Sequence, residues 1–280
     1  MDILVSNSLT PEEKARMEEV YRDCCRRAGP CAEPFLSGEL NFDKNIPCFF
    51  QGLEDGRLAG FLVLFMPGAQ EAEAAAFVRP DCQGRGCFSA LYRRALEEVR
   101  RAGIPRVLFV VGDRGPRGRA VAEHYGARPD HGENRMFRDG GPAPAHPDLT
   151  CQKVGGPDGP PMDEVRRGFS FQAGDDFLQA ALESPGRAAF LVRLGAQPIG
   201  GFMFSAATPG TLFLHSVGIA PAHRGRGLGR QLMGLALEEA EKRGGEVVLD
   251  VDTANTPACR LYLGCGFATR YRTDYYALDL

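Results

Sequence analysis

The stretch that decides the fold is Val217-Gly218-Ile219-Ala220-Pro221-Ala222-His223-Arg224-Gly225-Arg226-Gly227-Leu228-Gly229-Arg230-Gln231-Leu232. An apolar, β-prone run ends at Pro221, a basic glycine-rich turn follows, and an amphipathic helix begins near Leu228. Such a turn directs several backbone N–H groups toward one point at the positive end of a helix dipole. The stretch therefore predicts a strand, a phosphate-binding turn and a helix in succession.

A weaker copy of this stretch lies upstream. Aligned without a gap, residues 80–103 and 221–244 are identical at ten of 24 positions. The elements around each copy have the same order: helix, hairpin, strand, glycine turn, long helix, strand, short helix. The sequence therefore predicts a tandem duplication with domains at 1–145 and 146–280, divided near the proline- and glycine-rich residues 140–161.

The expected fold class is α/β, with an α+β mixed sheet: each domain is a mostly antiparallel mixed sheet flanked by helices. A threonine cap at Thr10 and a proline at Pro11 predict the start of the first helix. From turn signals and apolar periodicity, helices are expected at 10–28, near 35–40, and at 86–102, 118–125, 175–182, 228–243 and 257–265. Strands are expected at 1–5, 48–53, 58–65, 74–78, 106–111, 149–154, 188–194, 199–204, 212–219, 247–252 and 273–280.

Composition limits the classes of function. Hydrophobic residues make up 44% and charged residues 25% of the 280 residues, which is typical of a globular protein. A formal net charge of −3 gives no reason to expect a nucleic-acid partner, and no apolar run is long enough for a membrane span. The N-terminal residues 1–6 lack a signal-like pattern, so a cytoplasmic protein is expected.

The nine cysteines have scattered spacing and form no CxxC pair. This argues against a disulfide framework and against a structural zinc site, so no metal is expected. Most of these cysteines are expected to be small buried hydrophobic residues.

The glycine turn admits rival interpretations. A Rossmann fingerprint needs G-x-G-x-x-G after the first strand of a βαβ unit, whereas Gly225-x-Gly227-x-Gly229 has another spacing and follows a later strand. A P-loop needs Gly-Lys-Ser/Thr, which is absent. The simplest alternative is a glycine turn that reverses the chain and binds nothing.

Two motifs carry a family resemblance. Arg224-x-x-Gly227-x-Gly229, after Val217-x-Ile219-x-Pro221, resembles motif A of the GNAT acetyltransferases. Asn255-Thr256-Pro257-Ala258-Cys259-Arg260-Leu261-Tyr262-Leu263-Gly264-Cys265-Gly266-Phe267 is similar to the family pattern N-x-x-A-x-x-x-Y-x-x-x-G-F and follows at the usual separation. Together the motifs cover most of residues 149–280.

The resemblance implies an acetyl-CoA (CoA) site and a catalytic tyrosine. The pantetheine arm would pair with the strand, and the pyrophosphate would lie on the turn. Tyr262 would be the general acid that returns a proton to the departing thiolate, because a phenol is neutral at pH 7. The cofactor-binding residues implied in this way are Val217, Gly218, Ile219, Arg224, Gly225, Arg226, Gly227, Leu228, Gly229, Arg230 and Asn255.

The general base is left open between His215, Asp252 and a water relay. His215 has the better intrinsic pKa, whereas Asp252 is nearer the end of its strand, where the cleft should open. Side chains alternate along a strand, which predicts that His215, Val217 and Ile219 share one face, as do Asp250 and Asp252.

The first copy departs from the motif. Phe88 stands where the turn of the second copy has Gly229, and Ala122 aligns with Tyr262. We therefore expect residues 1–145 to be a GNAT-like domain without catalysis, which leaves open whether it binds CoA, shapes the substrate cleft or serves only as a structural partner. The expected function is an acetyl-CoA-dependent N-acetyltransferase acting on a primary amine of a small molecule or peptide, as a monomer (a pseudo-dimer of domains) or a homodimer. The alternatives are a non-catalytic acyl-CoA-binding regulatory module and a nucleotide-binding protein.

Overall fold

The computed structural model describes residues 1–29, 31–112, 116–155, 157–169, 178–179, 182–183, 186–208 and 210–280. The chain forms two compact units. Unit 1 comprises Met1–Glu133 and Tyr271–Leu280, and unit 2 comprises Asn134–Arg270. Among the described residues, no helix is both long and apolar enough to cross a membrane.

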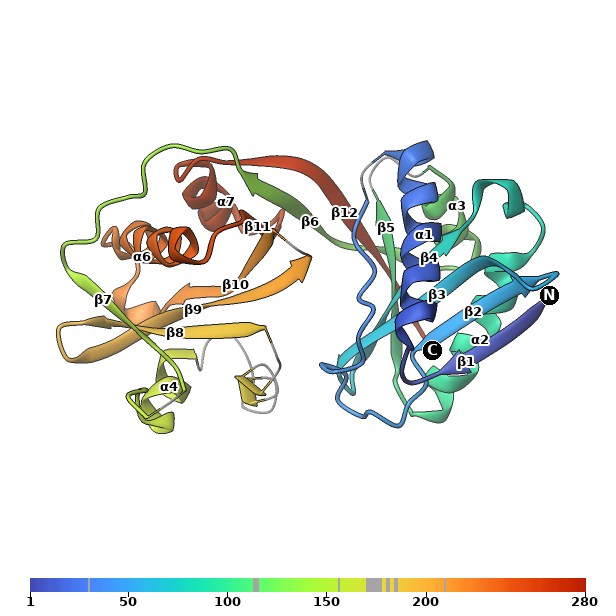
Figure 1. Ribbon diagram of the computed structural model, residues 1–280, viewed down its shortest axis with the longest axis horizontal. Coiled ribbons are helices and arrows are strands. Elements are labelled where there is room, and N and C mark those ends of the chain that lie inside the picture. The colour runs from blue at the N-terminus through green and yellow to red at the C-terminus, as the bar shows by residue number, and fades with distance from the viewer. Residues whose placement is uncertain are drawn as a thin grey trace. The chain divides into compact units, whose positions relative to one another are not determined.

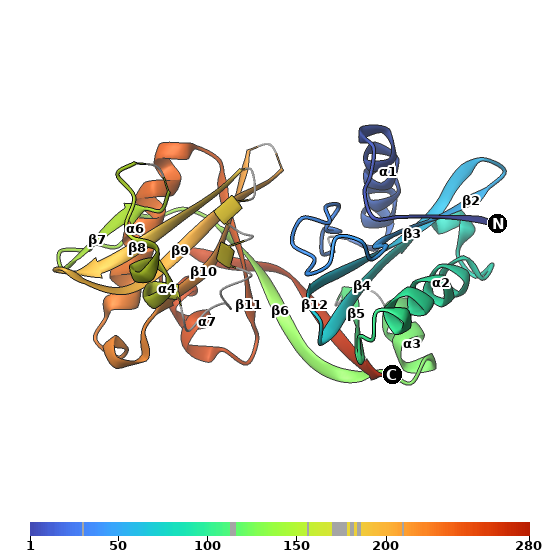
Figure 2. The same cartoon turned by 90° about the horizontal axis from the view of Figure 1, so that it is seen from below.

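Unit 1 is a sheet with helices on both faces. Its elements are β1 (Asp2–Ser6), α1 (Pro11–Ala28), β2 (Phe49–Glu54), β3 (Arg57–Gly68), β4 (Glu71–Val78), the 3-10 turn η1 (Pro80–Cys82), α2 (Cys87–Arg101), β5 (Arg106–Gly112) and α3 (Pro116–His124). The strand order is β1-β2-β3-β4-β5-β12, where β12 is Phe267–Asp279. Figure 2 shows α1 on one side of the sheet and α2 and α3 on the other. Central strand β3 is therefore apolar on both faces: the run 61–64 is at most 2% exposed.

Helix α1 begins as its sequence predicts. The Thr10 side chain accepts a hydrogen bond from the Glu13 amide, and the Glu13 carboxylate accepts one from the Thr10 amide, which completes a capping box. Pro11 occupies the first turn, where no intrahelical N–H is needed.

Unit 2 repeats the arrangement. Its elements are β6 (Arg128–Arg138), β7 (Leu149–Lys153), α4 (Met162–Phe169), β8 (Arg187–Leu194), β9 (Gln197–Thr208), β10 (Thr211–Ile219), the 3-10 turn η2 (Pro221–His223), α6 (Leu228–Arg243), β11 (Glu246–Asp252) and α7 (Thr256–Leu263). The strand order is β6-β11-β10-β9-β8-β7. Helices α6 and α7 lie on one side of this sheet and α4 on the other (Figure 1).

The two faces of unit 2 carry separate apolar clusters. Leu232, Met233 and Ala236 of α6 are fully buried in the cluster that contains Phe190 and Phe202. On the opposite face, Phe169 of α4 packs directly over Gly201, where an added Cβ would lie 2.3 Å from the ring. A glycine in the middle of β9 thus allows the α4 side to approach closely.

The last strand of each half serves the unit built from the other half. In β12, residues Thr273–Asp279 pair antiparallel with Gly112–Arg106 of β5 inside unit 1. In the same way β6, which ends the first half, lies beside β11 in unit 2. The limits 1–145 and 146–280 stay a prediction from the repeated sequence, and the compact units differ from them because their final strands are exchanged.

The element predictions are confirmed for the helix at 10–28, both hairpins, both glycine turns and the long helices after them. Four differ: residues 35–40 form no helix, β6 and α4 have no counterpart among the predicted elements, and β12 begins at Phe267 instead of residue 273. Charged and glycine residues interrupt the apolar pattern of β6, so its period-2 signal is weak. The predicted helix at 175–182 lies mostly outside the described residues.

Candidate active site

The glycine turn of unit 2 has the backbone of an anion-binding loop. Gly225 (φ 76°) and Gly227 (φ 78°) are both left-handed, and α6 begins directly after Gly227 without a side-chain cap. A Cβ on either glycine would meet nothing within 4 Å, so conformation rather than crowding requires glycine. The uncapped first turn of α6 leaves N–H groups for an anion at the positive end of the helix dipole.

Two arginines of the turn are held by backbone carbonyls. Arg224 Nε donates to the Ile219 carbonyl at 2.9 Å, and Arg230 Nη1 donates to the Gly264 carbonyl at 2.9 Å. These bonds tie the turn to the end of β10 and to the end of α7. Arg226 is exposed.

The end of β10 presents a backbone edge. The Ala220 amide donates a hydrogen bond to the Ile199 carbonyl at 2.7 Å. A Cβ added to Gly200 would lie 2.2 Å from the Gly218 carbonyl oxygen. Gly218 and Ala220 therefore turn toward β9. Since backbone groups alternate along an antiparallel strand, the N–H and C=O of Ile219 point away from β9. Gly200 was missed in the sequence analysis, although the pair Gly200-Gly201 inside an apolar strand is a signal of close backbone approach.

A β-bulge interrupts β10 just before this edge. Ser216 has φ 49°, and the register with β9 shifts between His215 and Gly218. His215 pairs with Met203 but Ile219 pairs with Gly200, so the two side chains lie on opposite faces of the sheet. The prediction that His215, Val217 and Ile219 share a face is therefore wrong, because the extra residue reverses the alternation.

Strands β10 and β11 separate after a short parallel ladder. Thr211–Phe213 pair with Glu246–Val248, and the fully described remainder of both strands has no further register between them. Val217–Ile219 and Asp252 thus stand at the open end of two diverging strands. A ligand chain can take up strand-like hydrogen bonds at such an edge.

Tyr262 is buried within α7. It is 7% exposed, its ring centroid lies 6.0 Å from that of Phe267, and its hydroxyl has no hydrogen-bond partner among the described residues. Burial, with Cys259 and Cys265 nearby, raises the pKa of Tyr262 to about 12. The phenol therefore keeps its proton at neutral pH.

Asn255 caps α7. Its side-chain oxygen accepts a hydrogen bond from the Ala258 amide at 3.2 Å, which fixes the start of the helix that carries Tyr262.

The acidic residues of β11 have different partners. Asp250 accepts two hydrogen bonds from Arg135 of β6, at 2.5 and 2.8 Å, and the Arg135 guanidinium also lies 4.9 Å from the centre of the Phe213 ring. Asp252 is exposed and accepts a hydrogen bond from the Ala254 amide at 2.7 Å. Asp250 is therefore engaged as an ion pair, whereas Asp252 lies at the open strand end.

The surroundings of His215 favour the uncharged form of its imidazole. Burial and then the adjacent Arg187 guanidinium lower the pKa of His215 to about 3. Arg187 Nη1 is 3.3 Å from His215 Nε2, and Ser216 Oγ is 3.4 Å from Nδ1. The imidazole is consequently uncharged at neutral pH.

Unit 1 has the same turn but a different strand before it. Gly86 (φ 81°, ψ 3°) reproduces Gly227 (φ 78°, ψ −3°), and the side-chain amide of Gln83 donates to the Val78 carbonyl at 3.0 Å as Arg224 does to Ile219. In contrast to β10, β4 pairs with β3 in regular register from Glu73 to Val78, so it has no bulge there.

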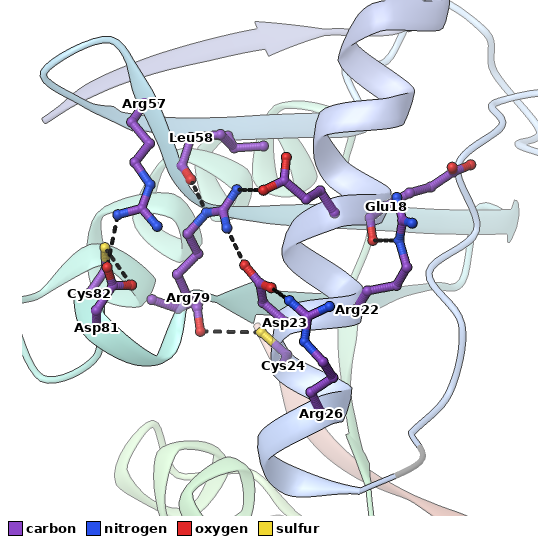
Figure 3. Close-up of polar contacts among 12 residues, drawn as sticks. Glu18, Arg22, Asp23, Cys24, Arg26, Arg57, Leu58, Arg79, Asp81 and Cys82 are labelled. Atoms are coloured by element: carbon purple, nitrogen blue, oxygen red, sulfur yellow. Dashed lines mark hydrogen bonds and ion pairs between the residues drawn. The ribbon is translucent and has the colours of Figure 1, made fainter.

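Side chains fill unit 1 where unit 2 has its site residues. Phe88 stacks on Tyr92 with centroids 5.7 Å apart, and the fully buried Ala122 replaces the tyrosine. Helix α1 also reaches the end of β4: Arg79 binds Asp23, and Cys24 Sγ donates to the Val78 carbonyl at 3.3 Å (Figure 3).

Comparison with known protein families matches both halves of the chain to one family. The model of the Acetyltransferase (GNAT) family matches residues 14–127 and 161–267, one region in each half. The chain belongs to the GNAT acetyltransferase family. A mycothiol acetyltransferase of Nocardia farcinica is 32% identical over 258 residues, which cover 80% of each chain.

Solved structures support the tandem GNAT fold. A GNAT acetyltransferase from Sphaerobacter thermophilus matches with TM-score 0.74 at 18% identity, covering 99% of this chain and 95% of that one. A tandem GNAT protein from the clavulanic acid biosynthesis pathway matches with TM-score 0.72 at 20% identity, covering 99% and 98%. Both confirm the predicted fold class, a mixed α/β fold of tandem GNAT-like domains.

Proposed function

We propose that the C-terminal half of this GNAT acetyltransferase transfers the acetyl group of acetyl-CoA to a primary amine of a small molecule or peptide. The observation that carries the proposal is the asymmetry between the halves. Both have the left-handed glycine turn, but only the second joins it to a bulged strand, Ser216–Ile219, and to a buried tyrosine, Tyr262.

The residues at the open strand end fit an acyl-CoA. Bound acetyl-CoA supplies an acetyl group activated as a thioester. The backbone amides of residues 225–229, in the turn and at the start of α6, would donate to the pyrophosphate, since those of Arg224 and Arg230 already donate to the Pro221 and Gly227 carbonyls. Val217–Ile219 would present backbone groups to the pantetheine arm, and the Ile219 amide, which points away from β9, would supply a hydrogen bond to the acetyl carbonyl oxygen. Asn255 acts by fixing α7 against this edge.

Tyr262 serves as the general acid. Its pKa of about 12 lies ~3.5 units above the ~8.5 of an ordinary thiol, so a complete proton transfer to the sulfur is uphill by roughly 5 kcal/mol. The role supported by this difference is a hydrogen bond to the sulfur that strengthens as the C–S bond breaks. Burial favours this role, because hydrogen bonds to charge are stronger away from water.

Asp252 is our candidate for the general base, acting directly or through water. It is exposed at the open strand end, whereas His215 lies on the face of the sheet opposite to the Ile219 side chain. The Nocardia farcinica relative, named as a mycothiol acetyltransferase, favours a small-molecule acceptor.

The test is release of free CoA thiol from acetyl-CoA with a panel of small primary amines and N-terminal peptides. The proposal predicts amine-dependent thiol release and an acetylated amine. Binding of acetyl-CoA without turnover on every amine would instead support a non-catalytic acyl-CoA-binding module. Competition of ATP or NAD against CoA would support a nucleotide-binding protein.

A further inference from the structure

Two thiols of unit 1 lie in direct contact. Cys25, near the end of α1, and Cys31, beyond the end of the helix, have their Sγ atoms 2.8 Å apart. Both side chains are half-buried, in contrast to the buried Cys48, Cys82, Cys87 and Cys265. The Tyr21 hydroxyl donates to the Cys31 carbonyl at 2.9 Å, which holds Cys31 beside α1.

The pair lies where β4 and β5 end. Cys24, next to Cys25, bonds to the carbonyl of Val78, the last residue of β4 (Figure 3). An added Cβ on Gly112, the last residue of β5, would lie 3.5 Å from the Cβ of Cys31. Cys24 and Cys31 thus contact the ends of both strands, at the place that corresponds to the open strand end of unit 2.

The two thiols have complementary acidity. A hydrogen bond from the Cys31 side chain lowers the pKa of Cys25 to about 7, against burial and the Glu33 carboxylate, which raise it. The same hydrogen bond and burial raise the pKa of Cys31. Burial raises the pKa of neighbouring Cys24 to about 11. A thiol whose pKa is close to the ambient pH combines a large thiolate fraction with good nucleophilicity.

We propose that Cys25 and Cys31 are a redox-active dithiol that low-molecular-weight disulfides convert into an intramolecular disulfide. The Cys25 thiol releases its proton to water, and the resulting thiolate attacks one sulfur of the oxidant RS–SR, breaks the S–S bond to form a mixed disulfide and releases RS⁻. The Cys31 thiol gives its proton to RS⁻, and its sulfur attacks Cys25 Sγ and displaces the second RS⁻, which takes a proton from water. The protein loses two electrons and two protons, and RS–SR becomes two RSH.

The test treats the full chain with oxidised glutathione at neutral pH and maps disulfides by mass spectrometry of non-reduced peptides. The wild type is expected to form the Cys25–Cys31 linkage. Cys31→Ser is expected to stop at glutathione bound to Cys25, because the resolving thiol is missing. Cys24→Ser is the matched control, since it removes the adjacent thiol and should leave the linkage intact.

Alkylation rates provide a measurement that needs no disulfide. At neutral pH, iodoacetamide is expected to label Cys25 of the wild type before Cys24, and circular dichroism verifies that each variant is folded. A linkage between Cys24 and Cys31, no linkage at all in the wild type, or equal labelling of Cys24 and Cys25 would overturn the proposal. Acetyltransferase activity does not enter either readout.

Discussion

Replacing the corresponding glycine in each turn distinguishes an effect on protein stability from an effect on ligand binding. Gly227 and Gly86 have nearly the same backbone angles, and neither has an atom within 4 Å of an added Cβ. Alanine in the left-handed region costs about 1–2 kcal/mol. Gly227→Ala and Gly86→Ala should therefore lose similar free energies of unfolding, measured by urea denaturation.

Their effects on CoA binding should differ. To relieve the strain that Gly227→Ala introduces, the start of α6 must shift, which misaligns amides that we propose hold the pyrophosphate. Loss of one hydrogen bond to a charged group costs about 1.5–3 kcal/mol, or roughly 10- to 100-fold in Kd. Titration calorimetry with CoA should thus show weaker binding for Gly227→Ala and unchanged binding for Gly86→Ala.

The matched pair makes the outcome decisive. If Gly227→Ala binds CoA like the wild type although it is destabilised, the turn of unit 2 does not hold the ligand. Equal weakening by Gly86→Ala would mean that the turn of unit 1 contributes as much, against the asymmetry on which the proposal rests.

Three further predictions concern charged and titratable side chains. The pKa of His215 is lowered from 6.5 to about 3, so below pH 6.5 the unfolded chain takes up a proton that the folded chain excludes. From pH 6.5 down to about pH 3, the free energy of unfolding should fall by up to about 1.4 kcal/mol for each pH unit, and His215→Gln should remove this pH dependence. Equal slopes of unfolding free energy against pH for the wild type and His215→Gln, measured by urea denaturation, would contradict this prediction. Arg79 is buried against Asp23, Glu19 and the Leu58 carbonyl. Arg79→Met should therefore lower the free energy of unfolding, measured by urea denaturation, by about 3 kcal/mol. A decrease below about 1 kcal/mol would show that water replaces the guanidinium as the partner of these groups. Asp252→Asn should lower kcat at least about 10²-fold with the Kd for CoA kept, as expected for a base; an unchanged pH–rate profile would exclude that role.

Local sequence signals predicted most of the elements. The helix start at Thr10 and Pro11 and the two glycine turns need only residues that are close in sequence, and each formed as expected. The identity between residues 80–103 and 221–244 likewise predicted that the two turns have one geometry, as Gly86 and Gly227 do.

Features that depend on contacts between distant segments could not be predicted from the sequence. The residue at the bulge is Ser216, and no glycine or proline at that position predicts a bulge. The bulge places the His215 side chain on the face of the sheet opposite to the predicted one. The exchange of β6 and β12 depends on pairing between segments far apart in sequence, and Arg135 meets Asp250 only because β6 lies beside β11. The pKa of His215 follows from burial and from Arg187, neither of which the sequence reveals.

The most direct test of the central claim is the turnover of Tyr262→Phe, measured as CoA thiol release with an amine that the wild type acetylates. Phenylalanine keeps the buried ring and removes only the hydroxyl, which has no hydrogen-bond partner among the described residues, so the fold and the Kd for acetyl-CoA should be kept. The account predicts that kcat falls by about 10²- to 10⁴-fold. An unchanged kcat would show that the hydroxyl of Tyr262 does not act on the leaving thiolate.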